Sequence, residues 1–280
     1  MNFHIVTIFP EIFNSYFNES ILKRSQTNKI IDIKIHNLRD WTADKHKTVD
    51  DTPYGGGAGM VIKIEPLYKA IQSIAPFTRP VYCGDKGARL PLRGTSGQGK
   101  GDLKSKIILL SAKGKKWNQQ LAKKYSKLNN IILICGRYEG VDERIKNFID
   151  EEISLGNYVL TGGEIGAMAI VDSITRLLPG ALGNEQSAKN ESHSQPGVLE
   201  YPQYTRPEIF TTRSFTPLIK GGRGIFTPFI KGARLPLRGT NGQGKGDFSG
   251  IKKYRVPKVL LSGDHRKIEE WRRKKMKKVK

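Results

Sequence analysis

The stretch IILICGRYEG, residues 131–140, decides the fold of this 280-residue chain. Its first part, Ile131–Cys135, consists of five consecutive apolar residues. Such a run is typical of a parallel strand buried on both faces, because helices cover both sides of a parallel sheet. The glycine-bearing loop CGRYEG follows at once. Since open α/β sheets bind ligands at the carboxyl ends of their strands, the stretch predicts a central strand that ends at a ligand site.

Outward from this strand, short apolar runs alternate with helical patterns. The expected strands are Phe3–Phe9, Ile31–Asn37 and Ile107–Leu110, and the expected helices are Pro10–Lys23, Glu65–Ile74, Trp117–Tyr125 and Ile165–Arg176. Near the carboxyl end, a short apolar run and a turn at Ser262–Asp264 precede a very basic helix. This alternation indicates an α/β protein.

Two nearly identical segments interrupt the pattern. Lys86–Asp102 reads KGARLPLRGTSGQGKGD, and Lys231–Asp247 reads KGARLPLRGTNGQGKGD. Both are rich in Gly, Pro and basic residues and have no sustained periodicity, so we interpret them as parts of inserted low-complexity loops, about 75–104 and 214–252. Each copy contains G-x-x-x-x-G-K, but a glycine stands where a phosphate-binding loop needs Ser or Thr. Nucleotide hydrolysis at these loops is therefore a remote alternative.

Composition narrows the class of protein. Lys and Arg outnumber Asp and Glu by 48 to 26, which points to a polyanionic partner, although the two inserts supply part of the excess. Two cysteines, Cys83 and Cys135, cannot form a disulfide framework, and no Cys/His cluster has the spacing of a zinc site. The amino terminus does not resemble a signal peptide, and no apolar run approaches the roughly 20 residues of a membrane span. We expect a cytoplasmic protein with no membrane-spanning segment.

Four strings carry a resemblance to a known family. They are TVDDTPYGGGAGM (48–60), LICGRYEGVDERI (133–145), ISLGNYVLTGGE (153–164) and LEYPQYTRPE (199–208). In this order they closely resemble the bacterial tRNA (guanine-N1)-methyltransferases of the SPOUT class, which methylate the guanosine 3′ of the anticodon, position 37. The resemblance covers roughly 1–74, 106–213 and 253–272 and is interrupted at the two repeats, which supports their interpretation as insertions.

The resemblance implies a fold and a division of the chain that the apolar pattern does not reveal. A trefoil-knotted α/β methyltransferase domain is expected over 1–180, followed by a linker over 181–213. The insert 214–252 then separates it from a short basic helical part, 253–280, that binds the anticodon arm of tRNA. The family also works as a homodimer whose site is shared between subunits. A knot breaks the usual rule against threaded chains, so the pattern of apolar residues alone does not predict it.

The resemblance further implies S-adenosylmethionine as cofactor, held in the knot by backbone groups and an apolar wall. The implied cofactor-binding residues are Leu110, Gly136, Tyr138, Gly140, Leu155, Gly156, Asn157, Tyr158, Val159, Leu160, Gly162 and Gly163. Mg²⁺ is a second implied cofactor, with Glu139 as its ligand. Taken alone, each glycine-bearing loop is equally consistent with a tight turn. In the string SAKG, Ala112 stands where the family has Pro, so we expect a slacker turn there.

A further loop is the implied substrate side of the site. Its residues resemble the family's loop near the target guanine and are Asp50, Asp51, Tyr54, Gly57 and Gly59. The alternative is an Asx turn, in which the aspartates only cap their own loop.

Methyl transfer to guanine N1 needs a base for the N1 proton and a donor for the charge that develops on O6. The family's arginine carries over to Arg176 in SITR, whose alternative role is that of a helix-terminal cation. The position of the family's aspartate depends on which string is used to align the sequences. Alignment from PGALGNEQSA places it at Glu191, whereas alignment from LEYPQYTRP places it at Ser192. Glu191 is the expected base. The neighbouring His193, with an ordinary pKa near 6.5, is an alternative proton acceptor.

The last helix is the expected RNA surface. Its basic residues are Arg266, Lys267, Arg272, Arg273, Lys274, Lys275, Lys277, Lys278 and Lys280. Attraction to phosphates explains such a cluster directly, and a solvated basic tail is the alternative. We therefore expect a tRNA guanine-N1 methyltransferase. The alternative is a catalytically impaired relative that only binds RNA, suggested by the inserts, the short basic tail and the glutamate in place of aspartate.

Overall fold

The computed structural model describes residues 1–74, 105–184, 191–195, 197–213 and 251–278. The expected insert 75–104 lies outside these residues, as does the insert 214–252 except for its last two positions. The chain divides into two compact units, Met1–Val198 and Leu199–Lys280. None of the described helices is long and apolar enough to cross a membrane.

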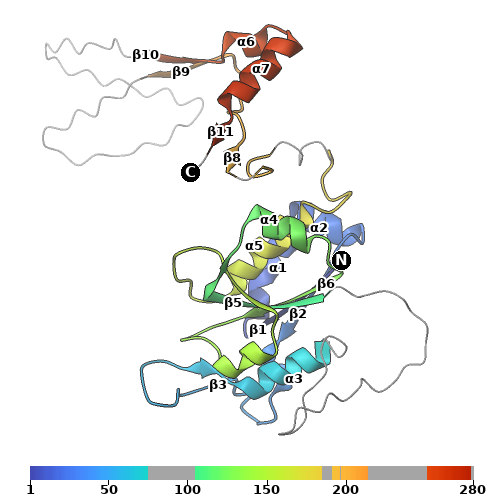
Figure 1. Ribbon diagram of the computed structural model, residues 1–280, viewed down its shortest axis with the longest axis vertical. Helices are drawn as coiled ribbons and strands as arrows, with labels where there is room; N and C mark the ends of the chain where they lie inside the picture. Colours follow the sequence, from blue (N-terminus) through green and yellow to red (C-terminus); the bar gives the residue numbers. More distant parts are fainter. Residues whose placement is uncertain (75–104, 185–190, 196, 214–250, 279–280) are drawn as a thin grey trace, which may run out of the picture. The chain divides into compact units, whose positions relative to one another are not determined.

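The first unit is built on a parallel sheet of five strands in the order β2-β1-β6-β5-β7 (Figure 1). Its strands are β1 (Asn2–Thr7), β2 (Asp32–Asn37), β5 (Ser105–Lys116), β6 (Asn130–Cys135) and β7 (Glu151–Ser154), and a separate small ladder joins β3 (Asp50–Asp51) to β4 (Val61–Ile62). Strand β6 occupies the centre, and Ile131–Cys135 are all buried. The predicted central strand is therefore confirmed.

Helices cover both faces of this sheet, as Figure 1 shows. They are η1 (Pro10–Phe13), α1 (Asn14–Phe17), α2 (Ser20–Thr27), η2 (Leu38–Trp41), α3 (Ile64–Ile74), α4 (Gln119–Tyr125), η3 (Glu143–Asn147) and α5 (Glu164–Thr175). Along β6, Ile131, Leu133 and Cys135 belong to the core beneath α1, α2, α4 and α5. Ile132 and Ile134 belong to the opposite core, beneath η2, α3 and η3. Alternate side chains of one strand thus fill two cores, which explains its uninterrupted apolar sequence.

Some expected elements differ in extent. The helix expected over Pro10–Lys23 is broken into η1, α1 and α2, because Glu19 is extended and Ser20 has a positive φ of 48°. The strand expected over Ile107–Leu110 extends to Lys116. The following helix begins at Gln119, because the side chain of Asn118 accepts a hydrogen bond from the amide of Leu121 and caps it.

The extension of β5 carries an irregularity beside the carboxyl ends of the strands. The register between β5 and β7 shifts between Leu110 and Lys115, across the SAKG segment. At Gly114, a Cβ atom would lie 2.5 Å from the amide nitrogen of Ile153, so a side chain cannot be accommodated there without backbone movement. The close approach of the two strands therefore depends on this glycine.

The second unit contains a two-stranded antiparallel ladder and two helices. Strand β8 (Val198–Leu199) lies at the boundary of the units, and the elements that follow are β9 (Ile209–Arg213), β10 (Ile251–Arg255), α6 (Lys258–Leu261), α7 (His265–Lys275) and β11 (Lys277–Lys278). Arg213 of β9 pairs with Ile251 of β10, so two residues that are 38 positions apart in the sequence are neighbours in this ladder. Asp264 caps α7 by accepting a hydrogen bond from the amide of Lys267, as the Ser262–Asp264 turn predicts.

Candidate active site

Three loops at the carboxyl ends of the sheet strands are joined by backbone hydrogen bonds. The amide of Gly163 donates to the carbonyl of Gly136 at 2.9 Å, so segment 155–163 contacts the loop that follows β6. On its other side, the same β6 loop contacts the β3–β4 segment, since Glu139 donates to the carbonyl of Met60 and Ile62 donates to that of Gly140. The three strings of the resemblance that lie in the first unit therefore meet at one place.

A cavity of about 220 Å³ lies between these loops and the end of β5. Most of the implied cofactor residues line it, namely Leu110, Gly136, Tyr138, Gly140, Leu155, Tyr158, Val159, Leu160, Gly162 and Gly163, together with Glu139. Gly156 and Asn157 do not line it. Further lining residues that the sequence did not indicate include Lys113, Lys146, Glu152 and Gly166.

Glycines shape this cavity because neighbouring atoms leave no room for a side chain. A Cβ at Gly163 would lie 2.8 Å from Cα of Cys135 and 3.1 Å from the amide nitrogen of Gly136. A Cβ at Gly156 would lie 2.5 Å from Cε1 of Tyr158. Gly156 thus makes room for the ring of Tyr158, which does line the cavity. These glycines are required by close packing, beyond the demands of a turn.

A buried polar cluster supports the cavity from beneath. Glu164, the first residue of α5, is 2% exposed and accepts hydrogen bonds from the hydroxyl of Thr7 at 2.8 Å and from Nε of Arg137. The guanidinium of Arg137 also lies over the ring of Phe9, 4.7 Å from its centroid. Burial raises the pKa of the neighbouring Cys135 thiol, and the charge of Glu164 adds to the effect. This thiol is therefore a neutral core group and not a nucleophile.

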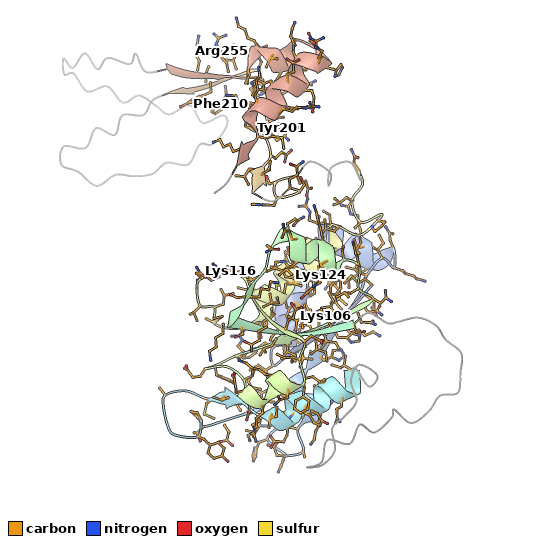
Figure 2. All side chains as sticks on the ribbon, viewed as in Figure 1. Lys106, Lys116, Lys124, Tyr201, Phe210 and Arg255 are labelled. Atoms are coloured by element: carbon orange, nitrogen blue, oxygen red, sulfur yellow. The ribbon has the colours of Figure 1, made fainter. Side chains whose placement is uncertain are left out.

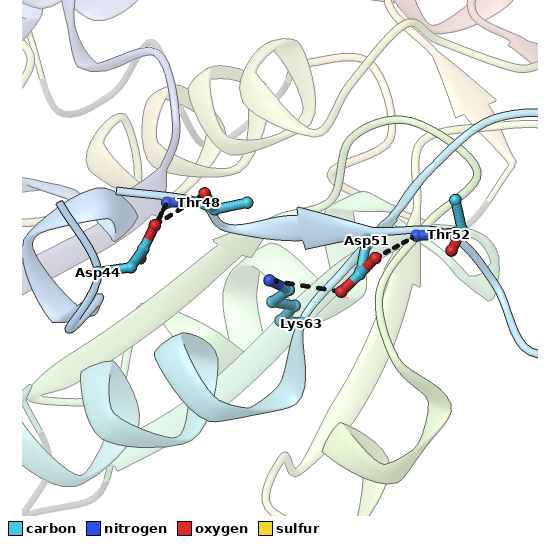
Figure 3. Close-up of polar contacts among 5 residues, drawn as sticks. All are labelled: Asp44, Thr48, Asp51, Thr52 and Lys63. Atoms are coloured by element: carbon cyan, nitrogen blue, oxygen red, sulfur yellow. Dashed lines mark hydrogen bonds and ion pairs between the residues drawn. The ribbon is translucent and has the colours of Figure 1, made fainter. Parts of the chain in front are cut away.

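The implied substrate-side loop is held by its own polar contacts (Figure 3). The carboxylate of Asp51 accepts a hydrogen bond from the amide of Thr52 at 2.9 Å and pairs with Lys63 at 3.5 Å. The Thr52 amide and the Lys63 ammonium lower the pKa of Asp51. Asp44 similarly accepts hydrogen bonds from the amide and hydroxyl of Thr48. Asp51 bonds the amide of the next residue, whereas an Asx turn bonds the amide two residues on.

Other residues of this loop are open to solvent or approach the cavity. The ring of Tyr54 is fully exposed, and the glycines at 55, 56, 57 and 59 all have positive φ angles. A Cβ at Gly59 would lie 2.6 Å from Cγ of Glu139, a cavity residue. Asp50 pairs through its backbone with Ile62. Gly59 is thus the implied substrate residue that lies against the cavity wall.

The donor set for a metal ion is small. Among the described residues, no three or more His, Cys, Asp or Glu side chains gather in a way that could hold a metal. Glu139 is exposed and lines the cavity, as do Glu143 and Glu152. Magnesium keeps several water ligands and binds through one or two carboxylates, so Glu139 stays a predicted ligand.

The two implied catalytic residues lie in contact. Arg176, the C-cap residue of α5, forms an ion pair with the carboxylate of Glu191 through its guanidinium. The loop after Glu191 is fixed by hydrogen bonds, from the amide of Ser194 to the Glu191 carbonyl and from the amide of His193 to the Val198 carbonyl. Glu191 and Ser192 are the two candidates for the base, and the carboxylate of Glu191 contacts Arg176.

This pair does not line the cavity of its own chain. Glu164 begins α5 beside the cavity, whereas Arg176 follows its last residue. At 1.5 Å per residue, these two positions are about 18 Å apart along the helix. The pair and the cavity therefore lie at opposite ends of α5.

Comparison with known proteins gives a consistent result. The family described as "tRNA (Guanine-1)-methyltransferase TrmD" matches residues 1–224. Proteins named tRNA (guanine-N(1)-)-methyltransferase are similar over nearly the whole chain. The protein from Dictyoglomus turgidum is 46% identical over 270 residues, which cover 96% of this chain and 82% of the relative. The protein from Clostridioides difficile is 42% identical over 274 residues, which cover 98% of this chain and 91% of the relative.

Proposed function

The chain belongs to the tRNA (guanine-1)-methyltransferase family, and from this premise we propose that it transfers a methyl group to N1 of guanosine 37 in tRNA. The observation that carries the proposed mechanism is the ion pair between Arg176 and Glu191. It joins a carboxylate and a guanidinium, the two groups that proton removal from N1 and charge stabilisation at O6 require. The family match does not favour the alternative of an RNA-binding relative without activity.

Membership in this family implies a methyl donor of the S-adenosylmethionine type. When bound, this donor supplies a methyl group activated by a positively charged sulfur. We propose that it occupies the cavity at the ends of β5 and β6. The fit is supported by glycines that let backbone amides and carbonyls approach a ligand, and by the apolar side chains of Leu110, Leu155 and Leu160. Gly156 contributes indirectly, because it leaves room for the ring of Tyr158, which lines the cavity. Asn157, in the same segment, is proposed to contact the donor.

The trefoil knot is part of this proposal. Its support is the return of segment 155–163 to the β6 loop, through the hydrogen bond from Gly163 to Gly136 and the bridge between Arg137 and Gly162. The close approach of Gly163 to Cα of Cys135 leaves no room for a side chain between these two segments. A chain threaded through a loop requires such tight contacts.

In the proposed reaction, Glu191 accepts the N1 proton of guanine while the N1 electron pair forms the new bond to the methyl carbon. When bound, the donor would supply this carbon with its sulfur as the leaving group, which would keep the bonding electrons as a neutral thioether. Arg176 donates hydrogen bonds to O6, where negative charge develops, and its ion pair also orients the carboxylate. Asp51, Tyr54 and Gly57 border the guanine on the opposite side in this proposal.

We propose that the working site needs two copies of the chain. Because α5 separates the pair from the cavity by about 18 Å within one chain, the Arg176–Glu191 pair of one copy must serve the cavity of the other. The proposed surface for the second copy belongs to the first unit. Its exposed apolar side chains are Phe9, Ile12, Tyr16 and Ile165, with Tyr158, Val159 and Leu160 at the cavity. Such a group is typical of a homodimer interface.

The second unit is the proposed binding part for the anticodon arm. Exposed basic side chains on α7 include Arg266, Lys267, Arg273, Lys274 and Lys275. Arg272, on the same helix, is half-buried, and its guanidinium lies over the ring of Tyr201, 5.0 Å from the ring centroid. Magnesium remains a prediction from the resemblance, and no step of the reaction depends on it here. The cytoplasm, where tRNA is processed, is the proposed compartment.

The test is transfer of a labelled methyl group from S-adenosylmethionine to unmodified tRNA with G37. Glu191→Gln and Arg176→Ala should each abolish most incorporation, whereas the neighbouring change Ser192→Ala should not. Changing G37 of the tRNA to A37 should also abolish it. If the wild type binds the donor and the tRNA but transfers no methyl group, the alternative of an RNA-binding relative holds. Activity that survives in Glu191→Gln but is lost in His193→Ala would assign the base to His193.

A further inference from the structure

One stretch of the first unit is rich in lysine and contains no acidic residue. The segment from Ser105 to Cys135 contains seven lysines and no Asp or Glu. One of them, Lys106 at the start of β5, is paired with Glu151. A second, Lys113, lines the cavity. The remaining five form a group that we call the lysine patch: Lys115, Lys116, Lys123, Lys124 and Lys127.

All five side chains of the lysine patch are exposed, and they lie close together in the chain. Lys115 and Lys116 end β5, and α4 begins three residues later at Gln119. Figure 2 labels Lys116 at the end of β5 and Lys124 on α4. Trp117 fixes the corner between these elements, because its indole donates to the hydroxyl of Ser173 and its ring packs against Tyr125. The patch thus stands on a rigid part of the fold.

The ammonium groups of this patch are not neutralised by nearby acids. Within the described part of the chain, none of the five lies within ion-pair distance of a carboxylate. The charge of Lys124 helps to lower the pKa of Glu151, but this carboxylate is bonded to Lys106 and Tyr125. Several like charges held together without counter-charges attract a polyanion.

The lysine patch borders the loop that carries Glu191. The ammonium of Lys123 donates to the carbonyl of Ser194 at 2.7 Å. The residues at the start of α4, Asn118 and Gln119, line a shallow pocket together with His193 and Gly197. If a nucleotide of the tRNA binds at Glu191, the RNA strand on either side of it passes beside these lysines. Each nucleotide within a strand is flanked by two phosphates, so negative charge comes close to the patch.

We propose that the lysine patch is a second tRNA contact, in which its ammonium groups bind phosphates of the strand that enters or leaves Glu191. The proposal rests on the proposed function, because it assigns the patch to the same RNA. It differs from the proposed role of α7, since the patch belongs to the first unit and lies beside the reacting nucleotide. Lysines that contact only phosphates add affinity and position without adding base specificity.

The test compares tRNA binding by two triple variants of the full-length protein. The patch variant is Lys116→Gln, Lys124→Gln and Lys127→Gln. The control variant is Lys23→Gln, Lys29→Gln and Lys69→Gln, which removes the same charge from exposed positions elsewhere in the first unit. Binding of an unmodified tRNA transcript is measured by fluorescence anisotropy over a series of salt concentrations, and S-adenosylmethionine binding by calorimetry checks that the cavity is intact.

For the patch variant, we expect tRNA affinity at low salt to fall by about tenfold to a hundredfold, and the slope of log affinity against log salt to fall by about two. The control variant should retain most of the affinity and slope. Equal tRNA binding by the patch variant and the wild type, or an equal loss in the control, would overturn the proposal. Loss of binding to anionic phospholipid vesicles with unchanged tRNA binding would also overturn it, in favour of a membrane contact.

Methyl transfer is measured separately so that the two proposals can fail independently. If the wild type shows patch-dependent tRNA binding but transfers no methyl group, only the proposed function fails. If the patch variant methylates and binds tRNA as the wild type does, only the lysine patch fails. With both proposals correct, the patch variant should have a raised KM for tRNA and a nearly unchanged kcat at saturating tRNA.

Discussion

Arg137 donates from Nε to both carboxylate oxygens of Glu164, at 3.1 and 3.0 Å. The contact joins the loop after the central strand β6 to the first residue of α5, with Thr7 of β1 as a further donor. Three segments distant in the sequence are therefore fixed to one buried carboxylate beneath the cavity. This arrangement explains how loops with many glycines can form a defined binding site.

Glu164→Gln should lower the free energy of unfolding by about 3 kcal/mol, because it leaves the largely buried guanidinium of Arg137 without its counter-charge. Urea unfolding measures the change. A matched control is Glu143→Gln, which removes a carboxylate from an exposed pair with Lys146 and should cost at most about 1 kcal/mol. Similar losses in the two variants would contradict a special role for the buried pair. In a double-mutant cycle, Arg137→Met combined with Glu164→Gln should recover part of the loss.

Gly163→Ala should weaken both the fold and the proposed cofactor site. The added methyl group would meet Cα of Cys135 at 2.8 Å and Cβ of Leu110 at 3.0 Å, so the cavity wall has to move. Overpacking of this kind costs about 1–3 kcal/mol, and we expect S-adenosylmethionine affinity to fall at least tenfold. Gly183→Ala is the control, since nothing lies within 4 Å of a Cβ there. Calorimetric titration that finds equal donor affinity in the two variants would contradict the assignment of the cavity.

The free energy of unfolding should decrease as the pH falls, because a pair of histidines on the sheet becomes protonated. Nδ1 of His4 lies 3.0 Å from Nε2 of His36, and their rings are stacked. Burial lowers both pKa values, and the charge of Lys34 lowers them further, while Asp32 and Asp40 act in the opposite direction. Histidines with folded pKa values below 6.5 take up protons on unfolding. Their contribution is therefore complete above pH 6.5 and is lost as the pH falls below it.

The measurement is urea unfolding of the wild type between pH 7.5 and 5, compared with the double variant His4→Gln and His36→Gln. The wild type should lose free energy of unfolding over this range, and the double variant should show a smaller dependence on pH because both titrating groups are gone. The same pH dependence in both proteins would show that other groups cause it.

The sequence predicted those parts of the fold that depend on local pattern. Ile131–Cys135 was recognisable as the central strand because each residue faces one of two apolar cores. The break at Ser20 was not predictable, since its positive φ has no mark in the helical pattern of Ile12, Phe13, Tyr16 and Phe17. Strand β7 was missed because its sequence, EEIS, is polar. Its glutamates are held by Lys106, Lys146 and the hydroxyl of Tyr125, which the local sequence of the strand does not reveal.

The candidate site was predictable from the sequence only through its resemblance to a family. Spacing alone gives no reason for Arg176 to meet Glu191, because the contact depends on the path of the chain after α5. The polar cluster around Glu164 was not anticipated, since a glutamate at the start of a helix is usually a solvated residue that interacts with the helix dipole. Its burial results from the packing of three loops, which no local pattern encodes.

Sharing of the site between two copies leads to a complementation prediction. A Glu191→Gln subunit keeps an intact cavity, and a Gly163→Val subunit keeps an intact Arg176–Glu191 pair. A heterodimer of the two has one complete site, because the pair of one subunit serves the cavity of the other. Random remixing of equal amounts makes about half of the dimers mixed, so about a quarter of the wild-type methyl transfer should return. Each variant alone should be nearly inactive, and a mixture that stays inactive despite heterodimers on native mass spectrometry would mean that the pair and the cavity do not act across the interface.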